Sequence, residues 1–168
     1  MLRRYLVLLP LSLALLAGCG NGGAGEGTTL ENAQGVTRQI AGRWRGELHQ
    51  KGLLPFEIGV DISADGHGRV AYTGIECGGD WTLRGVQQTL PPNYVFTEKI
   101  DAGAGGSCKG TGTVTLAPIQ RHAPNEPAYS RLNYVFEGGG VSSRGLLRRT
   151  DASNLDQAFE GAGIAPPV

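Results

Sequence analysis

An alternation of apolar and polar side chains with a period of two residues constrains the fold of this chain more than any other feature. Over residues 56–63 every second residue is apolar, from Phe56 to Ile62, and the residues between them are polar or glycine. Successive side chains of a strand point to opposite faces, so this pattern is typical of a β-strand with one buried face. The Asp-Gly-His-Gly segment at 65–68 is a turn signal, and we expect it to close a hairpin.

Segments of the same kind recur along the chain, separated by connections that contain glycine or proline. We expect about eight strands, near residues 43–49, 56–63, 70–74, 81–83, 94–100, 111–116, 131–136 and 142–149. Short helices are expected at 31–41 and at 153–159, the second capped by Asp151 or Ser153.

Hairpin spacing between the strands favours a single small antiparallel meander. Closing such a meander removes the exposed strand edges that lead to unwanted pairing. The predicted fold class is therefore all-β, a closed or nearly closed barrel of lipocalin-like form with short N- and C-terminal helices.

The N-terminal residues have the pattern of a bacterial export signal. Two arginines precede an apolar run at 6–16, which is shorter than the helix of about 20 residues that spans a bilayer. The Leu16-Ala17-Gly18-Cys19 segment that follows resembles the lipobox of bacterial lipoproteins. The resemblance implies cleavage before Cys19, acylation of that residue and anchoring to a membrane through the acyl chains. In that family an aspartate after the cysteine favours the inner membrane, so Gly20 favours the outer membrane where the organism has one.

The alternatives for this segment are an ordinary secretory peptide that is cleaved elsewhere and an apolar N-terminal helix. With the lipobox interpretation, the signal peptide covers 1–18, and the lipidated cysteine with a flexible glycine-rich tether covers 19–30. One β domain at 31–160 and a flexible tail at 161–168 follow. Removal of the signal peptide leaves 13 basic and 15 acidic side chains. This weak negative balance gives no electrostatic basis for nucleic-acid binding.

Two further cysteines, Cys77 and Cys108, form an even pair in a chain that we expect to be exported. Such a pair indicates a disulfide, and for a loop of about 30 residues it would stabilise the fold by roughly 3–4 kcal/mol. The two cysteines fall in connections at the same end of an up-and-down meander, which allows their Cα atoms to lie within about 7 Å. A thiol or metal pair is the alternative, but no further ligands stand at metal spacing. We therefore expect no metal and no other cofactor.

Gly42-Arg43-Trp44, at the start of the first strand, is similar to the Gly-x-Trp opening of lipocalins. In that family the tryptophan closes one end of the barrel, and a basic side chain of the last strand packs over it. The resemblance implies that Arg144 or Arg148 takes this position.

A second resemblance covers residues 42–149. It is to small extracytoplasmic β domains found behind membrane anchors in actinobacterial serine/threonine kinases and in secreted bacterial proteins. It implies a disulfide-bonded domain used for sensing or binding, without established catalytic residues. The matching residues are Trp44-x-Gly46, Tyr72, Cys77-x-Gly79, Trp81-x-Leu83, Glu98, Cys108-x-Gly110, Tyr134 and Gly145-x-Leu147-x-Arg149.

Glu98 is the candidate polar residue of the interior, because the strand phase places it on the same face as Tyr94 and Phe96. Burial of an unpaired carboxylate is costly and raises its pKa. We expect an ion pair with Arg144 or Arg148. The alternatives are a polar anchor for a ligand inside a pocket and exposure near the barrel mouth.

Several side chains are expected to lie in the barrel interior. Aromatic rings usually fill a small barrel, although they also line sites for small apolar ligands. The candidates for a pocket or for the core are Trp44, Trp81, Tyr94, Phe96, Glu98, Tyr134 and Arg148.

No catalytic pattern emerges from the sequence. The three histidines have no ligand partner at a spacing of three or four residues, and the serines lack a Gly-x-Ser-x-Gly elbow. We therefore expect a non-catalytic binding or sensing module of the cell envelope, anchored to a membrane through Cys19. Its partner would be an envelope or extracellular protein. The alternative is a lipocalin-like carrier of a small apolar ligand.

Overall fold

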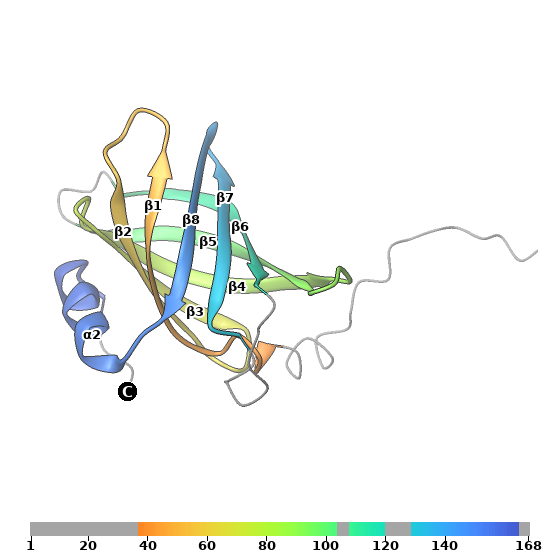
Figure 1. Ribbon diagram of the computed structural model, residues 1–168. Helices are drawn as coiled ribbons and strands as arrows, with labels where there is room; N and C mark the ends of the chain where they lie inside the picture. Colours follow the sequence, from red (N-terminus) through yellow and green to blue (C-terminus); the bar gives the residue numbers. More distant parts are fainter. Residues whose placement is uncertain (1–36, 104–107, 120–128, 165–168) are drawn as a thin grey trace, which may run out of the picture.

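The computed structural model describes residues 37–103, 108–119 and 129–164, so the expected signal peptide, the lipidation site at Cys19 and the tether lie outside the described residues. Eight antiparallel strands form a closed barrel in which each strand pairs with the next and β8 pairs with β1 (Figure 1). The elements are β1 (Gly42–Gln50), β2 (Phe56–Ile62), β3 (His67–Thr73), β4 (Cys77–Gln87), β5 (Asn93–Gly103), β6 (Gly110–Pro118), β7 (Arg131–Gly138), β8 (Val141–Arg149) and α2 (Ala152–Gly161). The predicted all-β barrel is confirmed.

The β2–β3 hairpin has the turn that the sequence indicated. The Ser63 hydroxyl donates a hydrogen bond of 2.8 Å to the carbonyl of His67, and the amide of His67 donates one of 3.1 Å to the Asp65 carboxylate. Gly66 has a φ of 90°, which glycine adopts without a steric penalty. The apolar side chains of β2 consequently all face the barrel interior, where they are buried.

Helix α2 packs against the outer face of β2 and β3 (Figure 1). Leu155 and Phe159 are buried there against Ala71, one of the small residues on this face. The predicted C-terminal helix is confirmed. Asp151 occupies the N-cap position, but its side chain makes no capping hydrogen bond. Ala162 is also buried and Ile164 packs against the same cluster, so the packed chain continues past the expected domain end at 160.

The described chain begins at Thr37, which is helical, and a turn at residues 38–40 then leads into β1. The amides of Ile40 and Ala41 both donate hydrogen bonds of 2.9 Å to the carbonyl of Thr37. Residues 38–40 form a turn and not a helix, and the rest of the helix expected at 31–41 lies outside the described residues. No helix in the described part of the chain is long and apolar enough to cross a bilayer.

Candidate functional site: a pocket at one end of the barrel

The two ends of the barrel differ. We call the end that carries the β1–β2, β3–β4, β5–β6 and β7–β8 connections the mouth, and the opposite end the closed end. The same strands connect the two ends. The ends therefore differ because each strand carries different side chains at its two termini.

Trp44 fills the closed end. It is fully buried, and its indole Nε1 donates a hydrogen bond of 2.8 Å to the carbonyl of Ile40. The guanidinium of Arg149 lies 4.4 Å from the centre of the Trp44 ring and donates hydrogen bonds to the carbonyls of Tyr129 and Ala41, at 2.7 and 2.8 Å. Cation and ring thus close this end together, in the manner that the Gly-x-Trp resemblance implied.

The basic residue over Trp44 is Arg149, so the expectation that Arg144 or Arg148 lies there is wrong. Arg144 and Arg148 are both exposed on the outer face of β8. Gly42 allows the contact with Arg149, because a Cβ atom there would lie 2.7 Å from a guanidinium nitrogen, and its φ of 122° suits glycine.

A pocket of about 200 Å³ opens at the mouth. Its walls are largely apolar, and its floor carries polar side chains that reach it from β3, β5 and β7. The residues that line it are Gln50, Phe56, Tyr72, Ile75, Cys77, Glu98, Ile100, Cys108, Lys109, Gly110, Tyr134, Phe136 and Ser143.

Two glycines of β6 shape this pocket in different ways. A Cβ atom at Gly112 would lie 2.1 Å from the ring of Phe136, so the absence of a side chain there makes room for one of the pocket walls. A Cβ atom at Gly110 would meet nothing within 4 Å. Gly110 lines the pocket, and strand alternation points its side-chain position inward, so the pocket extends into the space that a larger residue there would fill.

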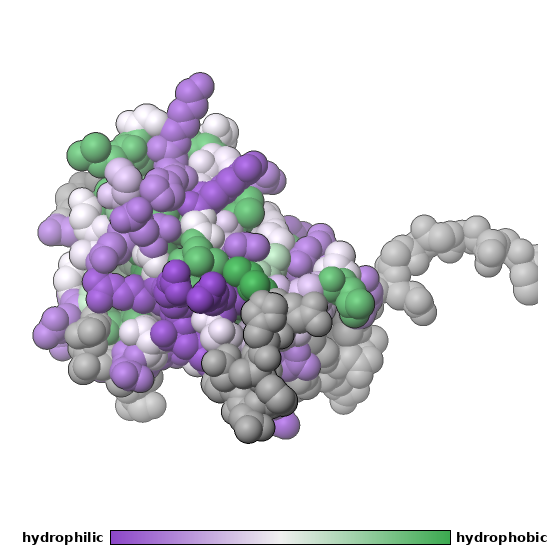
Figure 2. Space-filling model, viewed as in Figure 1, coloured by the Kyte–Doolittle hydropathy of each residue, from purple (hydrophilic) through white to green (hydrophobic). Residues whose placement is uncertain are grey.

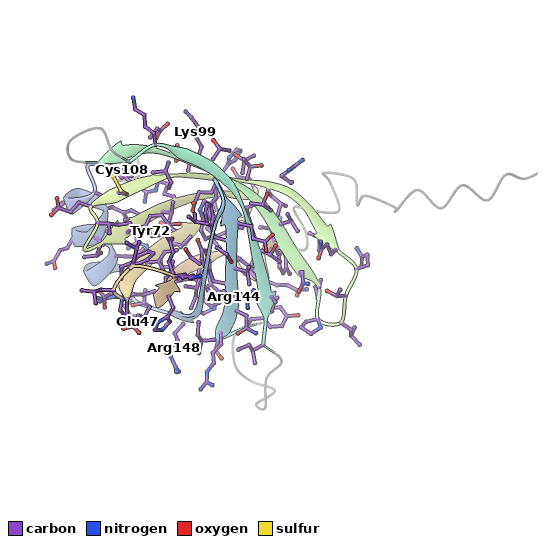
Figure 3. The ribbon with its side chains drawn as sticks, turned by 90° about the horizontal axis from the view of Figure 1, so that it is seen from above. Glu47, Tyr72, Lys99, Cys108, Arg144 and Arg148 are labelled. Carbon is purple, nitrogen blue, oxygen red and sulfur yellow. A yellow bond between two sulfur atoms is a disulfide. The ribbon has the colours of Figure 1, made fainter. Side chains whose placement is uncertain are left out.

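A hydrogen-bonded cluster around Glu98 forms the floor of the pocket. Tyr72 donates a hydrogen bond from its hydroxyl to Oε2 of Glu98, and Trp81 donates one of 2.7 Å from its Nε1 to the same oxygen. The hydroxyls of Tyr72 and Tyr134 lie 3.1 Å apart. Viewed from above, Tyr72 lies inside the ring of strands, whereas Lys99 and Arg148 lie outside it (Figure 3).

Burial controls the ionisation of this cluster. It is the main reason that the pKa of Glu98 is raised, and the hydrogen bonds from Tyr72 and Trp81 oppose the rise in part. Burial also raises the pKa values of Tyr72 and Tyr134, so both phenols remain protonated in ordinary buffers.

The predicted ion pair between Glu98 and an arginine is wrong. Glu98 is buried as the strand phase indicated, but its partners are the two aromatic donors, while Arg144 and Arg148 face solvent. The inward positions of β8 are Ser143, Gly145, Leu147 and Arg149, so Arg144 and Arg148, which lie between them, point outward.

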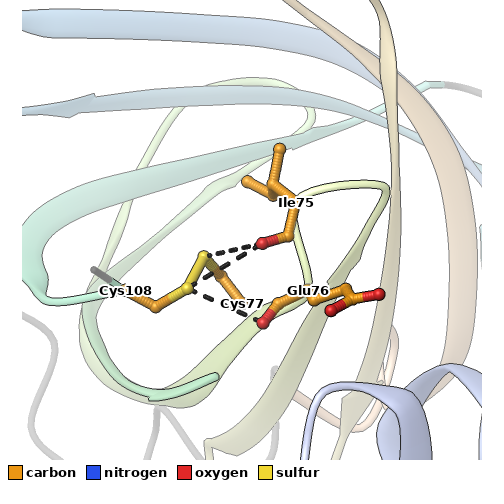
Figure 4. The surroundings of a disulfide bond; sticks show 4 residues. All are labelled: Ile75, Glu76, Cys77 and Cys108. Carbon is orange, nitrogen blue, oxygen red and sulfur yellow. Dashed lines mark hydrogen bonds between the residues drawn. A yellow bond between two sulfur atoms is a disulfide. The ribbon is translucent and has the colours of Figure 1, made fainter. Parts of the chain in front are cut away.

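The disulfide between Cys77 and Cys108 is present and borders the pocket, with the Cα atoms 5.4 Å apart. It joins the start of β4 to a position two residues before the start of β6. The sulfur of Cys77 lies 3.3 Å from the carbonyl oxygen of Ile75, and that of Cys108 lies 3.6 Å from the carbonyl oxygen of Glu76 (Figure 4). The bridge therefore holds the β3–β4 connection against the end of the β5–β6 connection at the mouth.

The structure divides the candidate residues into three groups. Trp44, Trp81, Tyr94 and Phe96 are fully buried and fill the barrel below the pocket. Glu98 and Tyr134 line the pocket, whereas Arg148 is exposed, so its assignment to the pocket or core is wrong.

Sequence reasoning did not assign Gln50 and Ser143 to the site. Ser143 donates a hydrogen bond of 2.7 Å to the side-chain oxygen of Gln50, across the β1–β8 pair at the mouth. Neither residue stands in a distinctive motif, and only the phase of β8 could have placed Ser143 inside the barrel.

Within residues 37–103, 108–119 and 129–164, no group of three or more potential metal ligands occurs. The site offers a small apolar space above a buried hydrogen-bond acceptor, an arrangement that can bind and orient a small molecule. Comparisons with protein-family models, with curated proteins and with solved structures gave no match to this chain.

Proposed function

We propose that this protein is a bacterial lipoprotein, anchored through Cys19, whose barrel binds a compact small molecule at its mouth. The observation that carries the binding role is the pocket of about 200 Å³ with apolar walls and a buried carboxyl group on its floor. Burial of a carboxylate without a counter-charge has a high cost in free energy. A purely structural barrel would therefore not require a buried carboxyl group beside an open pocket. The role is non-catalytic binding or carriage.

The rim of the mouth supports an apolar body for the ligand. Four of the five large hydrophobic side chains that are exposed in the described chain lie at mouth connections: Leu53, Leu54, Ile75 and Val141. The fifth, Leu90, lies in the β4–β5 connection at the closed end. Figure 2 shows hydrophobic groups at the β1–β2 loop and at the tip of the β4–β5 hairpin. An apolar rim favours the entry of a molecule that is itself partly apolar.

The volume limits the ligand. Pockets for drug-sized molecules usually measure about 300–1,000 Å³, so the space at this mouth suits a smaller compound or one end of a longer one. The aromatic residues below the pocket are packed together, with the rings of Trp81 and Phe96 5.6 Å apart. This filling favours a shallow binding site over a cup that extends through the barrel.

A second candidate function is the docking of an envelope protein. The exposed leucines of the β1–β2 loop favour it, because Leu54 is 86% exposed at the tip of this loop. This role would use the rim and not the floor, so substitutions at the two places distinguish the candidates.

Native mass spectrometry of the full chain in a non-ionic detergent tests small-molecule binding. We expect an additional mass that denaturation removes. Gly110→Phe should abolish it by filling the pocket, whereas Thr111→Phe places the same ring on the exposed outer face of β6 and should leave it unchanged. A bound mass that persists in Gly110→Phe would show that the ligand binds elsewhere.

Lipid anchoring is tested separately. Cells grown with an alkyne-tagged fatty acid should label the wild-type chain and not the Cys19→Ala variant. Labelling that persists in Cys19→Ala would contradict the lipobox assignment. Separation of inner and outer membranes then tests the preference for the outer membrane that Gly20 indicates.

A further inference from the structure

The hydrogen bonds of Glu98 are unevenly distributed over its two oxygens. Oε2 receives both hydrogen bonds, from Tyr72 and from Trp81. Oε1 receives none from the part of the chain that the structure describes, although the side chain is 2% exposed and lines the pocket. A carboxylate oxygen can accept about two hydrogen bonds, so Oε1 offers an unused acceptor at the floor.

Among the residues that the structure describes, none directs a free hydrogen-bond donor from the floor of the pocket toward Oε1 of Glu98. Because the Tyr72 proton points to Glu98, the Tyr72 oxygen accepts the proton of Tyr134. The polar hydrogens of Trp81, Tyr72 and Tyr134 are thus all used within the cluster. When Glu98 is ionised, the floor presents only acceptors, namely its Oε1 and the lone pairs of Tyr134, and a ligand must bring the donors.

The charges around Glu98 also favour a ligand that carries hydrogen-bond donors. No lysine, arginine or histidine in the described ranges lies within ion-pair distance of Glu98. The other ionisable groups of the pocket are the protonated phenols of Tyr72 and Tyr134 and, at the rim, the exposed Lys109. A ligand that carries its own positive charge would compensate the buried carboxylate.

We infer that the ligand of the mouth pocket is a compact primary amine with an apolar body, bound with its ammonium group at Oε1 of Glu98 and its body against the pocket walls. This inference rests on the proposed binding function and specifies the ligand class. The direction of binding follows from the polarity of the pocket, since its floor is polar while Phe56, Ile100 and Phe136 form apolar walls above it. An anionic head group would instead meet a carboxylate at the floor.

Three probes of similar size and different charge test the inference by calorimetry on the full chain in a non-ionic detergent: phenethylamine, phenethyl alcohol and hydrocinnamate. We expect the amine to bind at least about tenfold more tightly than the alcohol, and the anion to bind most weakly. Glu98→Gln keeps the shape of the side chain and removes its charge. It should lower the affinity for the amine about tenfold or more and leave that for the alcohol within about threefold.

A measurement on the wild-type chain covers the case in which Glu98→Gln does not fold, which circular dichroism would show. The amine should bind less tightly as the pH falls through the pKa of Glu98, and its binding near that pKa should release a proton. Titrations in two buffers of different ionisation enthalpy measure this release. Binding of the alcohol should release no proton.

The outcomes separate the inference from the function on which it rests. If the alcohol or the anion binds as tightly as the amine, or if Glu98→Gln leaves the preference unchanged, the amine inference is overturned while the binding pocket stands. If no probe binds but Gly110→Phe removes a natural bound mass that is not an amine, the inference is again overturned. If no probe binds and no mass depends on Gly110, both the inference and the proposed function fail.

Discussion

The closed end and the mouth of this barrel contain similar residue types and use them in opposite ways. At the closed end an indole and a guanidinium stack, and the donors of Arg149 and Trp44 are bonded to backbone carbonyls. At the mouth, Trp81 and two tyrosines surround a carboxyl group that retains an unused acceptor. Polar groups are fully hydrogen-bonded at the closed end, and an unused acceptor remains at the mouth, where we propose that the ligand binds.

Truncation of Trp44 should give the largest effect. Trp44→Ala removes a fully buried indole and leaves a cavity, so we expect a loss of about 3–5 kcal/mol in the free energy of unfolding. Phe136→Ala, at the half-buried pocket wall, should cost clearly less, because the pocket already provides space beside the ring. Urea unfolding of both variants measures the difference, and equal losses would contradict the distinction between the two ends.

Removal of the disulfide should destabilise the fold by a slightly smaller amount. The Cys77→Ser/Cys108→Ser variant releases a loop with a sequence separation of 31, for which we expect a loss of about 3–4 kcal/mol. Because the bridge lies at the mouth, hydrogen exchange should accelerate first around Ile75 and Glu76, and the amide of Trp44 should retain its protection. Acceleration spread evenly over both ends would contradict a local role for the bridge.

Substitution of Arg149 tests the closed end without opening the core. Arg149→Met loses the stacking on Trp44 and the hydrogen bonds to the carbonyls of Gln39, Ala41 and Tyr129, so we expect a loss of about 2–3 kcal/mol. Arg148→Met, at the exposed neighbouring position, is the matched control and should stay within about 0.5 kcal/mol of wild type. Thermal unfolding at equal protein concentration compares the two variants.

The smallest effect concerns the pH dependence of stability. Burial raises the pKa of Glu98 in the folded chain above its ordinary value of about 4.5, so between these two pKa values the folded state binds more protons than the unfolded state. The contribution of Glu98 to stability is therefore fully present below pH 4.5 and is lost as the pH rises through the folded-state pKa.

Glu98→Gln should lack this dependence. The stability of wild type relative to the variant should fall as the pH rises from about 4.5, a value set by the unfolded chain. If the stability of wild type and of the variant changes with pH in parallel, Glu98 titrates normally. The polar groups at the mouth are then as fully compensated as those at the closed end.

The strands with strong hydrophobic contrast could be predicted from the sequence. In β2 the apolar residues from Phe56 to Ile62 alternate with polar residues or glycine, and the predicted strand, its inward face and its turn are all observed. The disulfide between Cys77 and Cys108 could also be predicted, because the two form an even pair in a chain expected to be exported, and an up-and-down meander allows their connections to meet at one end.

The phase of β8 could not be predicted in the same way. Leu146 and Leu147 are adjacent, so each of the two faces carries one leucine. The residues that point inward include Gly145, where a Cβ atom would lie 2.6 Å from a methyl group of Leu48. The neighbouring strand β1 thus supplies the side chain that fills this space, and the sequence of β8 alone contains no sign of it. With the phase of β8 unresolved, Arg144 and Arg148 were expected to point into the barrel, and one of them was expected to pair with Glu98.

The position of Arg149 determines which end of the barrel the N-terminal segment joins. Its guanidinium bonds the carbonyls of Gln39 and Ala41, so the segment that enters the barrel from the N-terminal side is fixed at the closed end. If Cys19 carries the lipid, the chain that leads from it joins the barrel at the end opposite the opening of the pocket.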